Sequence, residues 1–333
     1  MATAMVTAQV QALAQADFSG IAARFADAGF GVSQPARGIL QIAAPQRTAP
    51  MRLLLSVGVH GDETGPIEML AQLLDETAAA PQRLALDLMV VVGNLDAIAQ
   101  GRRFIDADMN RMFRAERGDL ATAGEAARAD QIMQATEQFF AGSSAEKWHL
   151  DLHTAIRPSH YPTFAIVPDL IPDAGKQALC GWMAQAGIGA IVMNPTSAGT
   201  YSSWTATSFG TIGSTVELGR IGTLGQNDMA LFAAPKAALQ ALLYQDAASA
   251  AAAPAASQPQ VFRVAQQIIK LSDAFSMSFD HHTQNFTTLP RGTVIATDGA
   301  TVYQVEHEEE AVIFPNPDVR IGQRTGLMVV RQE

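Results

Sequence analysis

The sequence predicts an α/β domain with a mixed, mostly parallel sheet flanked by helices, followed by a smaller all-β domain. Over residues 1–248, short apolar runs typical of buried strands alternate with stretches of helical spacing, and this alternation predicts a sheet covered by helices on both faces. Residues 261–333 contain short β-type runs separated by Gly, Pro and Asn, which predicts a small β domain. Residues 249–260 are rich in Ala and Pro and are typical of a linker.

Hydrophobic periodicity and turn residues give the individual elements. Apolar residues at helical spacing predict helices over residues 6–28, about 63–80, 122–140, 173–186 and 228–244. Short apolar or alternating runs predict strands over residues 39–43, 51–57, 84–92, 147–153, 164–167, 190–193 and 211–217. In the β domain, strands are expected over residues 261–270, 293–296, 302–305, 312–314 and 327–330.

Composition limits the class of protein and partner. Of the 333 residues, 48% are hydrophobic and only 16% are charged, which predicts a packed core rather than a disordered chain. A formal net charge of −10 argues against a nucleic acid or an anionic membrane as partner. A small anionic substrate stays compatible, because the charge inside a pocket can differ in sign from the net charge. A homo-oligomer is neither required nor excluded.

The sequence also predicts a cellular location. The single cysteine, Cys180, cannot form an intrachain disulfide, which fits a reducing compartment. No Lys or Arg precedes Arg24, so we expect no signal peptide. No apolar run approaches the roughly 18–20 residues of a membrane-spanning helix. We therefore predict a soluble, cytoplasmic protein.

The α/β domain is predicted to form around residues 51–70, MRLLLSVGVHGDETGPIEML. An apolar strand ends at a turn containing Gly58 and Gly61, and a helix follows. His60 and Glu63 lie in this turn. Since ligands bind at the carboxyl ends of strands in open α/β sheets, an imidazole and a carboxylate here predict half of a metal site.

A catalytic zinc site typically uses three N or O ligands and keeps a fourth position for water. The best third ligand is His153, in the stretch WHLDLHT at residues 148–154. In a strand, His149, Asp151 and His153 share one face, while the leucines between them face a core. His153 would then lie at the same edge of the sheet as His60, and Asp151 is a candidate to orient a ligand.

Hydrolysis also needs a general base that takes a proton from the attacking water and passes it to the leaving nitrogen. Glu217 is the candidate, because it follows the apolar residues 211–216 at the carboxyl edge of a predicted strand. On composition alone, a helix-capping or salt-bridged glutamate explains Glu217 as well.

Five of the 22 basic residues fall within residues 102–117. Guanidinium groups suit bidentate binding of carboxylates and stabilisation of an oxyanion. The alternative is a solvated loop, and for Arg114 and Arg117 we favour that explanation.

Several motifs in order along the chain are similar to those of the succinylglutamate desuccinylase and aspartoacylase family. They are GVHGDETGPIEML, GNLDAIAQGRRFIDADMNRMF, DLHTAIR, STVELG and GQND. Near the end of the chain, FPNPDVRIGQRTGLM resembles the C-terminal β domain of that family. The resemblance implies a zinc-dependent enzyme with a zinc carboxypeptidase-like fold and one Zn²⁺ per chain.

The resemblance also implies a role for each matching residue. The implied zinc ligands and general base are the residues singled out above: His60, Glu63, His153 and Glu217. Arg103 matches the arginine that polarises the scissile carbonyl. Asn110 and Arg111 match the pair that binds a substrate carboxylate, and Arg157 is a candidate anchor for a second carboxylate of a succinyl substrate.

Within the family, DLHTAIR and GQND are more similar to the desuccinylases than to the aspartoacylases. Aspartoacylases carry an Arg upstream of the catalytic Glu where this chain has Thr207, and they use a Tyr in the C-terminal domain, whereas no Tyr follows Tyr303 here. We therefore expect hydrolysis of N-succinyl-L-glutamate to succinate and L-glutamate, the last step of the arginine succinyltransferase route of arginine catabolism. The alternatives are a deacylase of another N-acyl amino acid such as N-acetylaspartate, a carboxypeptidase, or a non-catalytic protein that binds zinc or a ligand.

Overall fold

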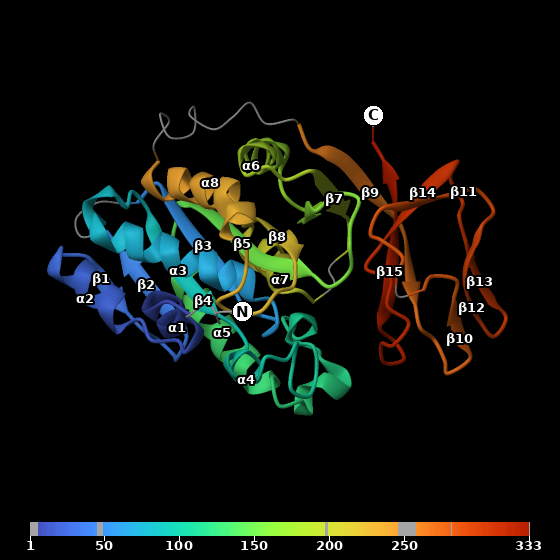
Figure 1. Cartoon of the computed structure of the whole chain (residues 1–333), viewed down its shortest axis with the longest axis horizontal. Coiled ribbons are helices and arrows are strands. Elements are labelled where there is room, and N and C mark those ends of the chain that lie inside the picture. Colours follow the sequence, from blue (N-terminus) through green and yellow to red (C-terminus); the bar gives the residue numbers. More distant parts are fainter. Residues whose placement is uncertain (1–5, 45–48, 197–198, 246–257, 281, 333) are drawn as a thin grey trace.

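The computed structural model describes residues 6–44, 49–196, 199–245, 258–280 and 282–332. The predicted alternation of strands and helices, followed by an all-β part, is present (Figure 1). Most of the predicted linker at residues 249–260 lies outside the described residues, and Gln260 already begins a strand. The domain boundaries at residues 248 and 261 stay a prediction.

All predicted strands of the α/β part form, and one more precedes them. They are β1 (Gly31–Ser33), β2 (Ile39–Ala43), β3 (Met51–Val57), β4 (Asp87–Val92), β5 (Glu146–Ala155), β6 (Thr163–Pro168), β7 (Ala190–Asn194) and β8 (Ile212–Arg220). The neighbours β4, β3, β5 and β8 run parallel, and β6 and β7 form a second parallel pair. Because β2 and β6 pair antiparallel with β4 and β8, the sheet here is mixed but mostly parallel, as predicted.

Helices cover both faces of this sheet (Figure 1). They are α1 (Ala8–Ala14), α2 (Ser19–Asp27), α3 (Thr64–Ala79), α4 (Leu95–Gln100), α5 (Ala126–Phe140), α6 (Asp173–Gln185), α7 (Tyr201–Phe209) and α8 (Ala233–Tyr244). Helices α1, α2, α3, α6 and α8 share a core cluster with Leu53 and Leu55 of β3. Helices α5 and α7 pack on the opposite face, against Leu54 and Met89. None of the described helices is long and apolar enough to cross a membrane.

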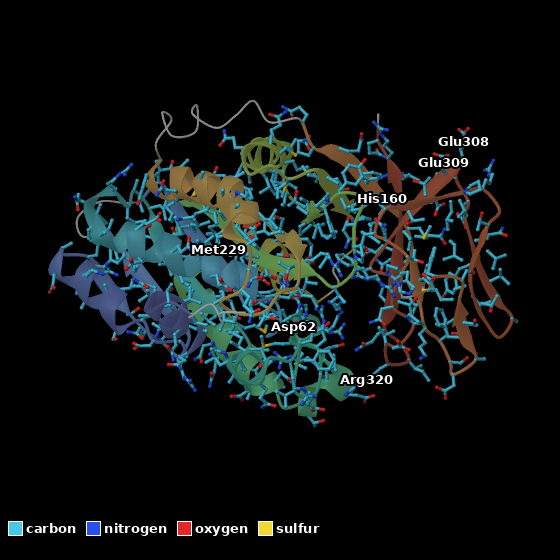
Figure 2. All side chains as sticks on the ribbon, viewed as in Figure 1. Asp62, His160, Met229, Glu308, Glu309 and Arg320 are labelled. Atoms are coloured by element: carbon cyan, nitrogen blue, oxygen red, sulfur yellow. The ribbon has the colours of Figure 1, made fainter. Side chains whose placement is uncertain are left out.

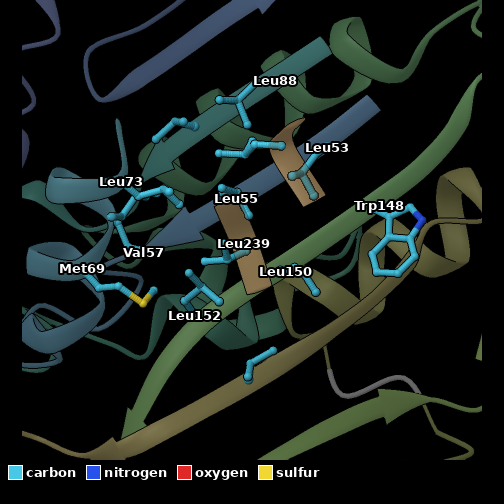
Figure 3. Packing of buried hydrophobic residues seen from close by; sticks show 14 of the residues in the cluster. Leu53, Leu55, Val57, Met69, Leu73, Leu88, Trp148, Leu150, Leu152 and Leu239 are labelled. Atoms are coloured by element: carbon cyan, nitrogen blue, oxygen red, sulfur yellow. The ribbon is translucent and has the colours of Figure 1, made fainter. Parts of the chain in front are cut away.

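The centre of the sheet is rigidly packed. Leu53, Leu55 and Val57 of β3 are fully buried, and Leu150 and Leu152 of β5 lie in the same cluster (Figure 3). Burial of each such side chain contributes about 1.5–3 kcal/mol. This packing fixes the carboxyl ends of the central strands, where the candidate site forms.

The C-terminal part is all β, as predicted. Its strands are β9 (Gln260–Ile269), β10 (Phe275–Met277), β11 (Thr287–Pro290), β12 (Val294–Asp298), β13 (Thr301–Gln304), β14 (Glu309–Ile313) and β15 (Arg324–Arg331). β9 pairs parallel with β7, so the main sheet continues in the order β1-β2-β4-β3-β5-β8-β6-β7-β9-β15-β14-β11, while β10, β12 and β13 form a separate sheet. These main-chain hydrogen bonds fix the β domain, and therefore its loops, against the α/β part.

The N-terminal region differs from its prediction, because two helices, α1 and α2, replace the single helix expected over residues 6–28. Ala16, between them, has a φ of 60°, a left-handed conformation that an α-helix of L-residues does not continue. The Asp17 carboxylate then accepts the Ser19 N–H at 2.9 Å at the start of α2.

Candidate active site

The turn between β3 and α3 presents His60 and Glu63 at the carboxyl edge of the sheet, and Asp62 marks this turn in Figure 2. Gly61 packs closely against α4: an added Cβ would lie 2.3 Å from main-chain atoms of that helix. Only glycine, which has no Cβ, fits at this position without a clash. The Gly61 N–H also donates to the Arg103 carbonyl at 3.0 Å. The second glycine of GVHGDE therefore fixes the turn, and with it the two side chains.

Strands β5 and β8 supply the second half of the site. Leu150 and Leu152 join the apolar core, as predicted, so Asp151 and His153 face the opposite side of the sheet. His153 is the direct neighbour of Glu217 on the parallel strand β8. Both side chains therefore reach the same edge of the sheet as His60.

His60, Glu63 and His153 form one buried cluster. Nδ1 of His60 lies 2.8 Å from Oε1 of Glu63, and Nδ1 of His153 lies 2.7 Å from Oε2. Oε2 also accepts the Thr154 N–H at 3.1 Å. Each of the three residues offers one ligand atom, and these atoms lie within 4.8 Å of one another. The cluster could hold a metal ion.

The second nitrogen of each imidazole faces another carboxylate. Nε2 of His60 lies 2.9 Å from Asp108, and Nε2 of His153 lies 2.9 Å from Asp151. Such carboxylates fix the ring orientation of metal-binding histidines and leave the other nitrogen for the metal. Two imidazole nitrogens and one carboxylate form a donor set that suits zinc and several other divalent ions. The residues therefore fit a divalent metal ion.

The pKa values of two buried carboxyl groups of the site are shifted in opposite directions. Burial favours a higher pKa for Glu63, but the charges of His60 and His153 outweigh burial and hold this pKa well below its usual range. Burial, together with the negative charge of Glu63, instead raises the pKa of Glu217 to about 7. Oε2 of Glu217 is buried and accepts no hydrogen bond from the residues that the structure describes. A carboxyl group of this kind is suited to accepting and returning a proton near neutral pH.

The segment after α4 brings Arg103, Asn110 and Arg111 to the same place. Nη1 of Arg103 donates to Oε1 of Glu63 at 2.8 Å, so this guanidinium lies directly beside the cluster. Nη2 of Arg111 lies 3.6 Å from Asp108. Oδ1 of Asn110 accepts a main-chain N–H at the start of α7 at 2.9 Å, which orients the amide. Three of the predicted polar residues therefore approach the cluster from one segment.

Glu125 organises this segment. Its carboxylate accepts main-chain N–H groups from Ile105 at 2.7 Å, Asp106 at 3.1 Å and Ala107 at 3.1 Å. The side chain is nearly inaccessible to solvent. Glu125 thereby holds the chain between Arg103 and Asp108 in one conformation.

A cavity of about 870 Å³ brings the predicted site residues together. It is lined by all eight of them: His60, Glu63, Arg103, Asn110, Arg111, His153, Arg157 and Glu217. Loops of the β domain form another part of its wall, including Phe314, Asn316 and Arg324. Arg320, labelled in Figure 2, also lines the cavity from the β domain, and its Nη2 donates to the Asp106 carbonyl oxygen at 3.4 Å. The two parts of the chain therefore enclose the cavity jointly.

Arg157 lines the cavity but is tied to the β domain. Its Nη1 donates to the Asp280 carbonyl at 2.6 Å and to the Thr283 carbonyl at 3.4 Å. The substrate contact predicted for Arg157 stays a prediction, and the observed contacts give this residue a second task in holding a loop.

Residues 49–243 match the family model described as the succinylglutamate desuccinylase/aspartoacylase catalytic domain. Residues 257–332 match the barrel-sandwich hybrid domain of the same group of proteins. The chain belongs to the succinylglutamate desuccinylase/aspartoacylase family.

Relatives of known name agree with this membership. The chain is 40% identical, over 290 residues, to a protein of Burkholderia orbicola (strain MC0-3) named succinylglutamate desuccinylase. The aligned residues make up 86% of this chain and 83% of the relative. Succinylglutamate desuccinylase from Vibrio cholerae superposes with a TM-score of 0.83 at 30% identity, covering 92% of this chain and 88% of that one. Succinylglutamate desuccinylase from Chromobacterium violaceum superposes with a TM-score of 0.77 at 32% identity, and the alignment covers 94% of this chain and 97% of that one. The predicted family, fold and enzyme class, a hydrolase, are confirmed.

Three residues of this family member's site escaped the sequence analysis: Asp108, Glu125 and Arg324. Asp108 lies within the motif RRFIDADMNR, between Arg103 and Asn110, so its position in the motif could have drawn attention to it. Arg324 lies within FPNPDVRIGQRTGLM, the stretch that resembles the C-terminal β domain of the family, but nothing in that stretch marks it as a site residue. Glu125 carries no such signal, because only the folded chain brings it to the site.

Proposed function

We propose that this chain hydrolyses N-succinyl-L-glutamate to succinate and L-glutamate, using one Zn²⁺ per chain. The observation that carries the proposal is the cluster of His60, Glu63 and His153, with Glu217 and Arg103 beside it in one cavity. The 40% identity to a protein named succinylglutamate desuccinylase supports the choice of substrate.

His60 and His153 would hold zinc through Nδ1, and Glu63 through its carboxylate. When bound, zinc supplies a Lewis acid that polarises a carbonyl group and lowers the pKa of water. Asp108 and Asp151 keep the two imidazole rings oriented.

Glu217 is the proposed general base. It takes a proton from the water that attacks the succinyl amide carbon, and it returns that proton to the glutamate nitrogen as the C–N bond breaks. The raised pKa of its buried carboxyl group, about 7, suits both transfers near neutral pH.

Arginine and amide side chains position the substrate. Arg103 stabilises the negative charge that develops on the amide oxygen. Asn110 and Arg111 bind the α-carboxylate of the glutamate half, and Arg157 is the proposed anchor for the distal carboxylate of the succinyl half. We further propose the cytoplasm as the location, the last step of the arginine succinyltransferase route as the physiological role, and a division into domains at residues 248 and 261.

Release of glutamate from N-succinylglutamate and N-acetylglutamate, and of aspartate from N-acetylaspartate, tests the proposal. Purified protein is assayed as isolated, after treatment with a chelator, and after zinc is restored. Zinc-restorable activity that is highest on N-succinylglutamate is the expected result. Higher activity on N-acetylglutamate or N-acetylaspartate would overturn the substrate assignment, and zinc binding without hydrolysis of any substrate would overturn the enzymatic proposal.

A further inference from the structure

The cavity wall is rich in arginine although the chain is acidic overall. The chain has 22 basic and 32 acidic residues, yet the described lining of the cavity contains six arginines and five carboxylates. The arginines are Arg103, Arg111, Arg157, Arg220, Arg320 and Arg324. A substrate with several carboxylates would be attracted to this cavity by more than one guanidinium.

Most of these guanidinium groups already have a partner. Arg103 donates to Glu63, Arg111 lies against Asp108, and Arg157 is bound to two main-chain carbonyls. Arg320 lies 3.9 Å from the Asp106 carboxylate, and Arg220 is exposed at the end of β8.

Arg324 is different. It is the first residue of β15 and is half-buried in the cavity wall, yet its side chain makes no hydrogen bond or ion pair with any residue that the structure describes. Burial and the nearby charge of Arg111 lower the pKa of this guanidinium to about 9. A half-buried cation without a protein partner costs free energy in the folded chain, and an anionic ligand at this position would offset that cost.

The location of Arg324 indicates which anion it would bind. Its electrostatic neighbours are Arg111 and Asp108, on the side of the cavity where the proposed function places the glutamate half of the substrate. Arg111 is already assigned to the α-carboxylate. The remaining negative group of that half is the side-chain carboxylate of glutamate.

We propose that Arg324 binds the side-chain carboxylate of the amino-acid half and so makes the enzyme selective for N-acylated acidic amino acids. This inference rests on the proposed function. Antiparallel pairing of Arg324 with Ile269 of β9 fixes the main chain from which the guanidinium projects. Arg324 is therefore a substrate-binding residue supplied by the β domain to a site whose chemistry lies in the α/β part.

A panel of substrates and variants tests the inference. Kinetics are measured on N-succinyl-L-glutamate, N-succinyl-L-glutamine and N-acetyl-L-glutamate for the wild type, Arg324→Met and Arg324→Lys. Arg331→Met, at the exposed far end of the same strand, is the matched control. Because hydrogen bonds to charged groups contribute about 1.5–3 kcal/mol, we expect the wild type to prefer the glutamate over the glutamine substrate by about 10- to 100-fold in kcat/KM.

In Arg324→Met the ratio of kcat/KM between the glutamate and the glutamine substrate should fall close to one, mainly because KM for the glutamate substrate rises. The ratio of kcat/KM between the succinyl and the acetyl substrate should stay unchanged. Arg324→Lys should recover part of the preference, and Arg331→Met should behave as the wild type. Removal of an unpaired cation should leave the melting temperature of the substrate-free protein unchanged or higher, which distinguishes lost binding from misfolding.

An unchanged preference for glutamate in Arg324→Met would overturn the inference, and so would a loss confined to the succinyl-to-acetyl ratio. Failure of the proposed function would look different, because the wild type would then hydrolyse none of the three substrates.

Discussion

The two walls of the cavity differ in how far their charged groups are already engaged. On the α/β wall, Glu63 contacts His60, His153 and Arg103 at 2.7–2.8 Å, and carboxylates hold the far side of each imidazole. On the β-domain wall, Arg324 faces the cavity without a partner among the described residues. Side chains that are held in place before the substrate arrives suit bond-breaking, whereas an unpaired cation suits selection of the substrate. Variants of the two walls should therefore fail in different ways.

The largest effect is expected for Glu217→Gln on the α/β wall. The amide cannot take a proton from water, so kcat should fall by about 10²–10⁴-fold. The loss should be similar for all substrates in the panel, unlike the selective loss expected for Arg324→Met. Steady-state kinetics with equal zinc loading checks this, and a variant that retains its turnover would remove Glu217 from the mechanism.

Arg103→Ala should have the next largest effect. Loss of a donor to a developing oxyanion lowers kcat by about 10²–10³-fold, with a smaller change in KM. Arg102→Ala is the matched control, because Arg102 is adjacent in sequence but exposed and does not line the cavity. Equal losses in the two variants would contradict the role given to Arg103.

Glu217→Gln should also change the stability of the metal-free protein in a pH-dependent way. The folded-state pKa of about 7 is above the ordinary value of 4.5, so the folded chain keeps this proton to a higher pH than the unfolded chain. The stability of the wild type is therefore complete below about pH 4.5 and decreases as the pH rises through about 7, by about 3 kcal/mol in total. The neutral glutamine lacks this decrease.

Denaturant unfolding of both metal-free proteins, at acidic pH and at about pH 8, measures the difference. The stability of Glu217→Gln relative to the wild type should increase with pH. A difference that does not depend on pH would show that Glu217 is not forced to ionise in a buried site. Together with the loss of kcat, the expected result would identify a residue whose position favours activity over stability.

Local patterns in the sequence predicted where four residues of the α/β wall lie, whereas the roles of Arg103, Asn110 and Arg111 came from the family resemblance. His60 and Glu63 share a glycine-containing turn after an apolar strand, and the alternation around His153 shows which face it occupies. Glu217 could be placed beside these residues because the carboxyl ends of neighbouring parallel strands meet at one edge of the sheet.

The β-domain wall could not be predicted in this way. Arg324 begins an ordinary apolar strand, and only the pairing of β9 with both β7 and β15 brings that strand to the cavity. Glu125 is similar, because it acts through three main-chain groups that lie near it only after folding. Sequence patterns report local geometry, whereas these two positions depend on contacts between distant segments.

Calorimetric titration of zinc into the metal-free protein tests the central claim most directly. We predict one site per chain in the wild type and in Arg324→Met, and loss of that site in Glu63→Gln, with circular dichroism confirming that each variant is folded. Binding of zinc to Glu63→Gln with wild-type affinity and stoichiometry would contradict the account, because the metal would then lie outside the cluster of His60, Glu63 and His153.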